Sequence, residues 1–117
     1  NTGMTLTLAL SYGGKQEIFK AVKEISEKVK NGIICLDNFD DSIINDHLYT
    51  KNLPDVDLLI RTSGEQRISN FLLWQIAYAE LYFTETYWPD FSEEDFTDAI
   101  IEYQKRERRF GKTSKQL

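Results

Sequence analysis

The chain of 117 residues is long enough for one small domain or for part of a larger one. Its composition, 41% apolar and 13% aromatic, is typical of a protein with a packed core and excludes wholesale disorder. The formal net charge of −5 argues against nonspecific binding to nucleic acid, and the single cysteine excludes an intrachain disulfide framework.

The first part of the chain predicts one strand followed by one helix. Residues Met4 to Leu10 are almost all apolar or threonine, which is typical of a strand buried on both faces. From Lys15 to Lys30 apolar residues recur at helical spacing, and Asn31-Gly32 supplies a stop signal. The glycines of Tyr12-Gly13-Gly14 could approach a phosphate, but we favour a simple turn from strand to helix.

An acidic linker follows this helix. Its aspartates do not form the Asp-Asp-x-x-Asp pattern of trans-prenyl synthases, because position 44 is Ile44. We interpret the linker as solvated, with a brief helix from Ser42 to Tyr49 whose cap is Asp41 or Ser42. His47, the only histidine, has no zinc-ligand pattern around it.

Three further elements are predicted in the middle of the chain. Val56 to Ile60 and Leu81 to Thr84 have the apolar character of short strands, and the first is predicted to be buried. Phe71 to Tyr78 is apolar nearly all round, which predicts a deeply buried helix.

The last helix has the clearest local signals. Ser92 is a good N-cap, and Asp95 stands three residues later in the position of a capping box. The basic residues from Lys105 to Arg109 are predicted to lie in the last turn, where they complement the helix dipole, and Gly111 is predicted to end the helix.

The alternation of strands and helices predicts an α/β fold, a parallel sheet flanked by helices. Ligands in such sheets bind at the carboxyl ends of the strands. The chain begins at Asn1 without an initiator methionine and enters strand-like sequence at once. We therefore expect residues 1–117 to be the C-terminal part of a larger single-domain fold.

The stretch from Arg61 to Asn70 is the strongest candidate site. It carries two arginines, several hydroxyl groups and a glycine between a predicted strand and a predicted helix. Arginine presents a fixed fork of donors that matches phosphate oxygens, and a helix starting at Ser69 or Asn70 would add free amide groups. The residues are compatible with a diphosphate cradle, and by themselves they do not favour it over a structural role. The alternative is structural: the arginines pair with Glu65 or Glu80, and Ser69 only caps its helix.

Glu80 is an acid within an apolar and aromatic stretch. A buried carboxylate needs a partner or a metal ion, because desolvating it alone is costly. Glu80 could ligate Mg²⁺, which prefers hard oxygen donors. An ion pair with Arg61 or Arg67 is the alternative, and the residues by themselves favour it.

Taken in order, these segments resemble the undecaprenyl diphosphate synthase family of cis-prenyltransferases. The resemblance spans nearly the whole chain, from Asn1 to Gly111, and its most specific stretch runs from Asp57 to Gln75. It continues through Ala77-Tyr78-Ala79-Glu80 and Trp88-Pro89-Asp90-Phe91 and closes with Arg106 to Gly111.

The resemblance implies an enzyme that adds isopentenyl diphosphate repeatedly to an allylic diphosphate such as farnesyl diphosphate, each new double bond being cis. It implies that Arg61, Arg67 and Ser69 hold the diphosphate of isopentenyl diphosphate and that Glu80 helps to position Mg²⁺. Arg109 and Gly111 would reach across the interface of a homodimer toward the substrate. The product would carry cell-wall sugars in bacteria.

The chain also departs from the family's pattern. The aspartate of the family's Asp-Gly-Asn segment, which binds Mg²⁺ and the allylic diphosphate, has no counterpart here. We therefore place no catalytic residue in the chain and expect it to be inactive by itself. A noncatalytic partner subunit of a heteromeric cis-prenyltransferase is the alternative. We expect a cytoplasmic location, no nucleic acid partner, and at most peripheral membrane contact at the inner face, through the lipid product.

Overall fold

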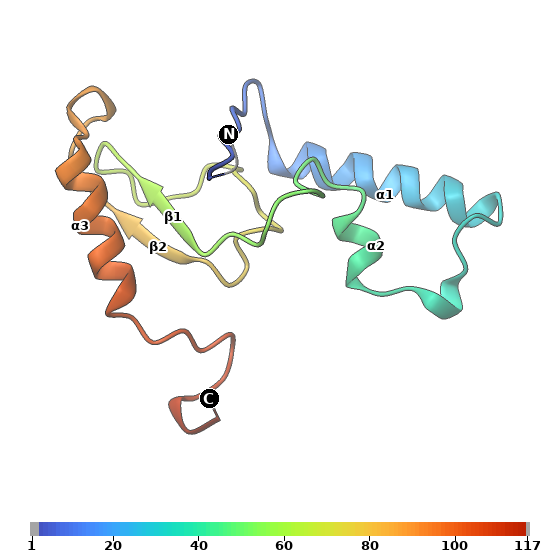
Figure 1. The fold of residues 1–117 in the computed structure, drawn as a ribbon. Coiled ribbons are helices and arrows are strands. Elements are labelled where there is room, and N and C mark those ends of the chain that lie inside the picture. Colours follow the sequence, from blue (N-terminus) through green and yellow to red (C-terminus); the bar gives the residue numbers. More distant parts are fainter. Residues whose placement is uncertain (1–2, 117) are drawn as a thin grey trace. The chain divides into compact units, whose positions relative to one another are not determined.

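The computed structural model describes residues 3–116. The chain divides into two compact units, Asn1–Leu53 and Pro54–Leu117. The first unit is helical, and the second holds a sheet with a helix against it (Figure 1). Each unit is described below by itself.

Helix α1, Gly14–Lys30, confirms the helix predicted from Lys15 to Lys30. Its buried face includes Ala21 and Ile25, four residues apart, as one stripe of a helix requires. Glu17 lies on the same face, 2% exposed, and its carboxylate accepts hydrogen bonds from the Tyr12 hydroxyl and from the Tyr49 backbone amide. This carboxylate therefore connects α1 to Tyr49, near the end of the first unit.

Helix α2, Asp41–Asn45, is shorter than the helix predicted from Ser42 to Tyr49. The predicted cap is also wrong by at least one residue, because Asp40 is the N-cap and its side chain accepts from the Ser42 amide at 3.0 Å. Hydrogen bonds from Ser42, first from its hydroxyl and then from its amide, hold the pKa of Asp40 below its usual value. A 3₁₀ turn, η1, Leu36–Asn38, precedes the helix.

The strand predicted from Met4 to Leu10 is wrong for this structure. The segment has no regular secondary structure, and its larger side chains are exposed. Met4, for example, is 78% exposed and Leu10 is 83% exposed. A strand needs a neighbour for its backbone hydrogen bonds, and within residues 3–116 the only ladder joins two later segments.

Strands β1, Leu58–Arg61, and β2, Glu80–Phe83, form the parallel pair of the second unit. Leu58 is opposite Glu80, and Arg61 is opposite Phe83. Helix α3, Glu93–Gln104, contacts β2 beside the sheet (Figure 1). The predicted α/β class with parallel strands is therefore confirmed. All four residues of β1 are half-buried, so the prediction of a buried strand is wrong.

The helix predicted from Phe71 to Tyr78 is also wrong for this structure. The segment is a series of turns, with Ser69, Asn70 and Leu72 in the left-handed region at φ 48°, 65° and 47°. Isolated turn hydrogen bonds replace the helical ladder, such as that from the Ile76 amide to the Leu72 carbonyl at 3.0 Å. Ile76 is the buried side chain of this stretch. The apolar pattern is present, but the backbone conformation of these residues prevents a regular helix.

Helix α3 begins as predicted and ends earlier. The capping box is complete, since the Ser92 side chain accepts from the Asp95 amide and the Asp95 side chain accepts from the Ser92 amide. The helix ends at Gln104 with Lys105 as C-cap, so the prediction that Lys105 to Arg109 fill its last turn is wrong. Gly111, six residues after the C-cap, is not the predicted helix stop. Two short 3₁₀ turns complete the unit, η2, Trp88–Asp90, and η3, Ser114–Gln116.

None of the helices formed by residues 3–116 is both long enough and apolar enough to cross a bilayer.

Candidate substrate-binding site

Arg61 is the last residue of β1, so its side chain lies at the carboxyl end of the sheet. Its Nη1 donates a hydrogen bond to the backbone carbonyl of Arg67 at 3.1 Å. The Arg61 carbonyl accepts from the Thr84 amide at 2.9 Å, which extends the ladder one step past the strands. Arg61 is therefore fixed by the sheet on one side and braces the following loop on the other.

The loop after β1 is held against the segment that follows β2. The Ser63 amide donates to the Thr86 carbonyl and the Gly64 amide donates to the Thr84 carbonyl, both at 2.9 Å. Gly64 has φ 71°, a left-handed conformation that glycine adopts without steric cost. A β-carbon at Gly64 would meet only Glu85, at 3.9 Å, so backbone conformation rather than space favours glycine there.

Arg67 presents its guanidinium to solvent at the tip of this loop. Its side chain is 67% exposed and forms an ion pair with Glu65, which is 39% exposed. The pairing of Arg67 with Glu65, one of the structural alternatives, is therefore present. A surface pair of this kind contributes about 0–1 kcal/mol, so a phosphate with a larger charge can displace Glu65.

Ser69 is exposed two residues after Arg67. No helix begins there, so the predicted contribution of a helix N-terminus to a phosphate cradle is wrong. The donors that remain around this loop are two guanidinium groups, the serine hydroxyl and loop amides. They suffice chemically for an anion, because charge-assisted hydrogen bonds from arginine are the stronger part of such a site.

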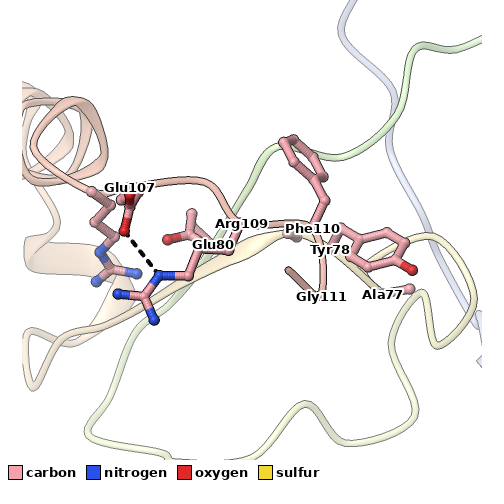
Figure 2. Close-up of a pocket in the computed structure, with 9 residues that line it drawn as sticks. Ala77, Tyr78, Glu80, Glu107, Arg109, Phe110 and Gly111 are labelled. Atoms are coloured by element: carbon pink, nitrogen blue, oxygen red, sulfur yellow. Dashed lines mark hydrogen bonds and ion pairs between the residues drawn. The ribbon is translucent and has the colours of Figure 1, made fainter. Parts of the chain in front are cut away.

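A separate open pocket of about 500 Å³ holds the other candidate residues. Glu80, Arg109 and Gly111 all line it. Figure 2 shows Glu80, Glu107 and Arg109 gathered at one end of the pocket, with the rings of Tyr78 and Phe110 at the other. The pocket therefore combines charged groups with an apolar surface, an arrangement that suits an amphipathic ligand.

The charges at the polar end are partly paired. Arg109 Nε donates to Glu107 Oε2 at 2.9 Å, the dashed line of Figure 2, and Ser114 Oγ donates to the same oxygen at 2.7 Å. The hydrogen bond from Ser114, and then that from Arg109, hold the pKa of Glu107 below its usual value. Glu107 is therefore ionised at neutral pH and competes with any anion for Arg109.

The strand register separates the two groups of candidates. Glu80 is opposite Leu58 at the amino ends of the strands, whereas Arg61 is at their carboxyl ends. Three residues of strand correspond to about 10 Å. The alternative that Glu80 pairs with Arg61 or Arg67 is wrong, since the ion pairs formed by residues 3–116 do not include Glu80.

The residues around Glu80 supply few ligands for Mg²⁺ by themselves. No cluster of three histidine, cysteine, aspartate or glutamate side chains forms among residues 3–116. Mg²⁺ is commonly held by one or two carboxylates together with substrate phosphates and water. Half-buried Glu80 therefore fits as one ligand of an ion whose remaining ligands come from a diphosphate and water.

The sequence reasoning missed one residue of this region, Arg108. We interpreted it as compensation of the helix dipole, but the helix ends at Gln104. Arg108 instead forms an ion pair with Asp57 at 3.1 Å, and this hydrogen bond is the main cause that raises its pKa above the ordinary value. The aromatic neighbours Tyr103 and Phe110 were the available signal, since both rings make cation–π contacts with this guanidinium.

The fold and the two groups of charged residues define an α/β protein with arginine side chains at both candidate sites. A family model described as "Putative undecaprenyl diphosphate synthase" matches residues 1–111. The chain belongs to the undecaprenyl diphosphate synthase family.

Curated relatives agree with this assignment. The isoprenyl transferase of Clostridium perfringens is 55% identical over 111 residues, which are 95% of this chain and 44% of that protein. The farnesyl-diphosphate-specific ditrans,polycis-undecaprenyl-diphosphate synthase of Haemophilus influenzae is 58% identical over 113 residues, 97% of this chain and 47% of that protein. The chain thus spans less than half the length of these relatives.

A solved structure gives the same fold. The crystal structure of lavandulyl diphosphate synthase from Lavandula x intermedia, in complex with dimethylallyl diphosphate, matches with a TM-score of 0.82 and 44% sequence identity. The match covers 88% of this chain and 44% of that one.

Proposed function

We propose that this chain is the isopentenyl-diphosphate-binding part of a cis-prenyltransferase. The reaction condenses isopentenyl diphosphate repeatedly with farnesyl diphosphate and yields undecaprenyl diphosphate, a lipid carrier for cell-wall synthesis. The observation that carries the proposal is the hydrogen bond from Arg61 to the Arg67 carbonyl, which fixes two arginines in one loop at the carboxyl end of β1. Membership of the family supports the same reading.

In this proposal Arg61, Arg67 and Ser69 hold the diphosphate of isopentenyl diphosphate. Holding the diphosphate orients the double bond toward the allylic carbon, and orientation of this kind lowers the barrier of a bimolecular step. The exposed guanidinium of Arg67 exchanges Glu65 for the phosphate. The braced guanidinium of Arg61 keeps the loop in place while that exchange occurs.

Glu80 would hold Mg²⁺ together with a substrate diphosphate. Such an ion, when bound, would stabilise the negative charge that develops on a diphosphate leaving group. Arg109 and Gly111 would reach toward the substrate across a homodimer interface. We propose a cytoplasmic protein that contacts the membrane only through its lipid product.

The test uses the protein encoded by the full open reading frame that contains this chain. The protein is incubated with labelled isopentenyl diphosphate, farnesyl diphosphate and Mg²⁺, and the products are resolved by chain length. We expect long prenyl diphosphates with cis double bonds. Binding of isopentenyl diphosphate without turnover, in a reading frame that lacks the Asp-Gly-Asn segment, would show the partner subunit instead. Absence of both binding and turnover would overturn the proposal.

A further inference from the structure

The segment 105–111 follows the last turn of α3. The amides of Lys105 and Arg106 still donate to the Glu102 and Tyr103 carbonyls of α3, both at 3.1 Å. Residues 107–111 continue the segment without regular secondary structure, so side-chain contacts are what hold this part in place. Arg106 supplies one attachment: its Nη1 donates to the Leu81 carbonyl of β2 at 2.6 Å. Its Nη2 also lies 3.4 Å from a carboxylate oxygen of Glu102, one helical turn earlier. Arg106 thus anchors the start of the segment to the sheet.

Arg108 supplies the second and larger attachment. Its Nη1 donates to Asp57 Oδ1 at 3.1 Å and to the Tyr103 hydroxyl at 2.8 Å. Its Nη2 donates to the Tyr78 carbonyl at 2.9 Å. One guanidinium therefore joins the residue before β1, the residue two before β2 and the last turn of α3, which are far apart in the sequence.

Two aromatic rings lie near the same guanidinium. Its central carbon lies 4.6 Å from the Phe110 ring centroid and 5.6 Å from that of Tyr103. The Phe110 ring in turn lies 6.0 Å from that of Tyr78. The Arg108 side chain is 18% exposed, less than those of Arg67 and Arg109 at 67% and 59%. The Arg108 guanidinium therefore makes internal contacts, and it is a poor candidate for binding a substrate.

The next residue, Arg109, points elsewhere. It lines the pocket with Glu80 and bonds to Glu107, while Arg108 faces Asp57 and the Tyr78 carbonyl. Phe110 at φ 50° and Gly111 at φ 80° turn the backbone directly after it. A β-carbon at Gly111 would lie 3.7 Å from the Tyr78 ring, so the turn packs against the residue whose carbonyl Arg108 holds.

We propose that Arg108 is a positioning residue: by joining Asp57, Tyr78 and Tyr103 it fixes the 105–111 segment so that Arg109 and Gly111 lie at the pocket beside Glu80. The inference rests on the proposed function, since it assigns Arg109 and Gly111 to substrate binding. Arg108 itself touches no substrate. Its effect on binding passes through Arg109.

The test compares four proteins made from the full open reading frame: wild type, Arg108→Gln, Arg109→Gln and the double variant. Each is titrated with isopentenyl diphosphate in the presence of Mg²⁺. We expect Arg108→Gln to raise Kd by about 10-fold, the scale at which misplacement of a binding group is felt. Because Arg108 acts through Arg109, adding Arg108→Gln to Arg109→Gln is expected to change Kd by less than about twofold.

Lys105→Gln is the matched control, because it removes one positive charge from an exposed side chain of the same segment. It is expected to leave Kd unchanged. Asp57→Asn removes the ion pair but leaves the contacts of Arg108 with the Tyr78 carbonyl and both rings, so it is expected to raise Kd less than Arg108→Gln does. If Arg108→Gln does not fold, Asp57→Asn provides the test in its place. Arg108→Lys keeps the charge without the planar fork and is expected to rescue binding only in part.

Amide hydrogen exchange of residues 109–112 gives a readout independent of substrate. We expect faster exchange there in Arg108→Gln and unchanged exchange in α1. An unchanged Kd in Arg108→Gln would overturn the inference. It would also be overturned if Arg108→Gln raised Kd by the same factor in wild type and in the Arg109→Gln variant. If wild type fails to bind isopentenyl diphosphate, the proposed function fails. Faster exchange would then still support the fixing of the segment, and unchanged exchange would overturn it.

Discussion

The Arg61 guanidinium lies 3.1 Å from the backbone carbonyl oxygen of Arg67, so one arginine of the candidate site braces the loop that presents the other. The two side chains therefore have different tasks. Arg61 is half-buried and held by the strand, whereas Arg67 is exposed and paired only with Glu65. A ligand that displaces Glu65 meets a guanidinium whose backbone is already fixed.

Arg67→Ala is expected to weaken binding of isopentenyl diphosphate by about 1.5–3 kcal/mol, the scale of hydrogen bonds to charged groups, or about 10-fold to 150-fold in Kd. Calorimetric titration of the full-length protein measures the change. Lys51→Ala, which removes an exposed cation outside the loop, is the control. An affinity that Arg67→Ala leaves unchanged would remove this loop from the site.

The pH dependence of Glu107 provides a second prediction. Its folded pKa is lowered, so its pairing with Arg109 is present above the ordinary carboxyl value of 4.5 and is lost as the pH falls through the lowered value. Carbon-detected NMR titration is expected to give a midpoint below 4.5. Ser114→Ala and Arg109→Gln should each raise that midpoint, because each removes a hydrogen bond to Glu107 Oε2 that lowers the pKa of Glu107. A midpoint that neither substitution raises would contradict the geometry around Glu107.

Glu17 shows a contact that the sequence could not reveal. It occupies an ordinary helical position, and its charge predicts an exposed side chain. In the structure it is 2% exposed, because its carboxylate accepts the Tyr49 amide at 2.7 Å from 32 residues further along the chain. No local pattern encodes such a partner.

Glu17→Ala is expected to destabilise the protein by about 1–3 kcal/mol, because it leaves the Tyr49 amide without its acceptor in a part-buried position. Glu17→Gln should cost less, since an amide oxygen still accepts from Tyr49 and the Tyr12 hydroxyl can rotate to accept from the amide nitrogen. Urea unfolding curves measure both. Equal losses for the two variants would show that the charge matters rather than the hydrogen bonds.

Local signals in the sequence predicted those elements whose cause is local. The capping box of Ser92 and Asp95 and the apolar spacing of α1 both lie within one or two helical turns. Contacts between residues far apart in the sequence could not be predicted in this way. Asp57 meets Arg108 across 51 positions, and neither residue carries a pattern that names the other. The sequence predicted which residue types form the candidate site. It did not predict that Arg61 lies at the carboxyl ends of the two strands and Glu80 at their amino ends.

The wrong predictions have a common physical origin. Apolar residues from Met4 to Leu10 and from Phe71 to Tyr78 predict burial, but an apolar pattern specifies neither the hydrogen-bond partner nor the backbone conformation. The first segment has no ladder within residues 3–116. The second follows the left-handed residues Ser69 and Asn70 and contains left-handed Leu72, a conformation that a regular right-handed helix does not include.

Leu72 offers a direct test of that second conformation. At φ 47° an L-residue is strained by roughly 1–2 kcal/mol relative to glycine, whereas in a helix interior glycine is less stable than alanine by roughly 0.5–1 kcal/mol. Leu72→Gly and Leu72→Ala both lose most of the leucine side chain, so the difference between their free energies of unfolding mainly reports the backbone preference at this position. We expect the glycine variant to be the more stable in urea unfolding. If the alanine variant is the more stable, residues 71–78 are helical in solution, and Ser69 regains a helix N-terminus as a source of amide donors for the diphosphate.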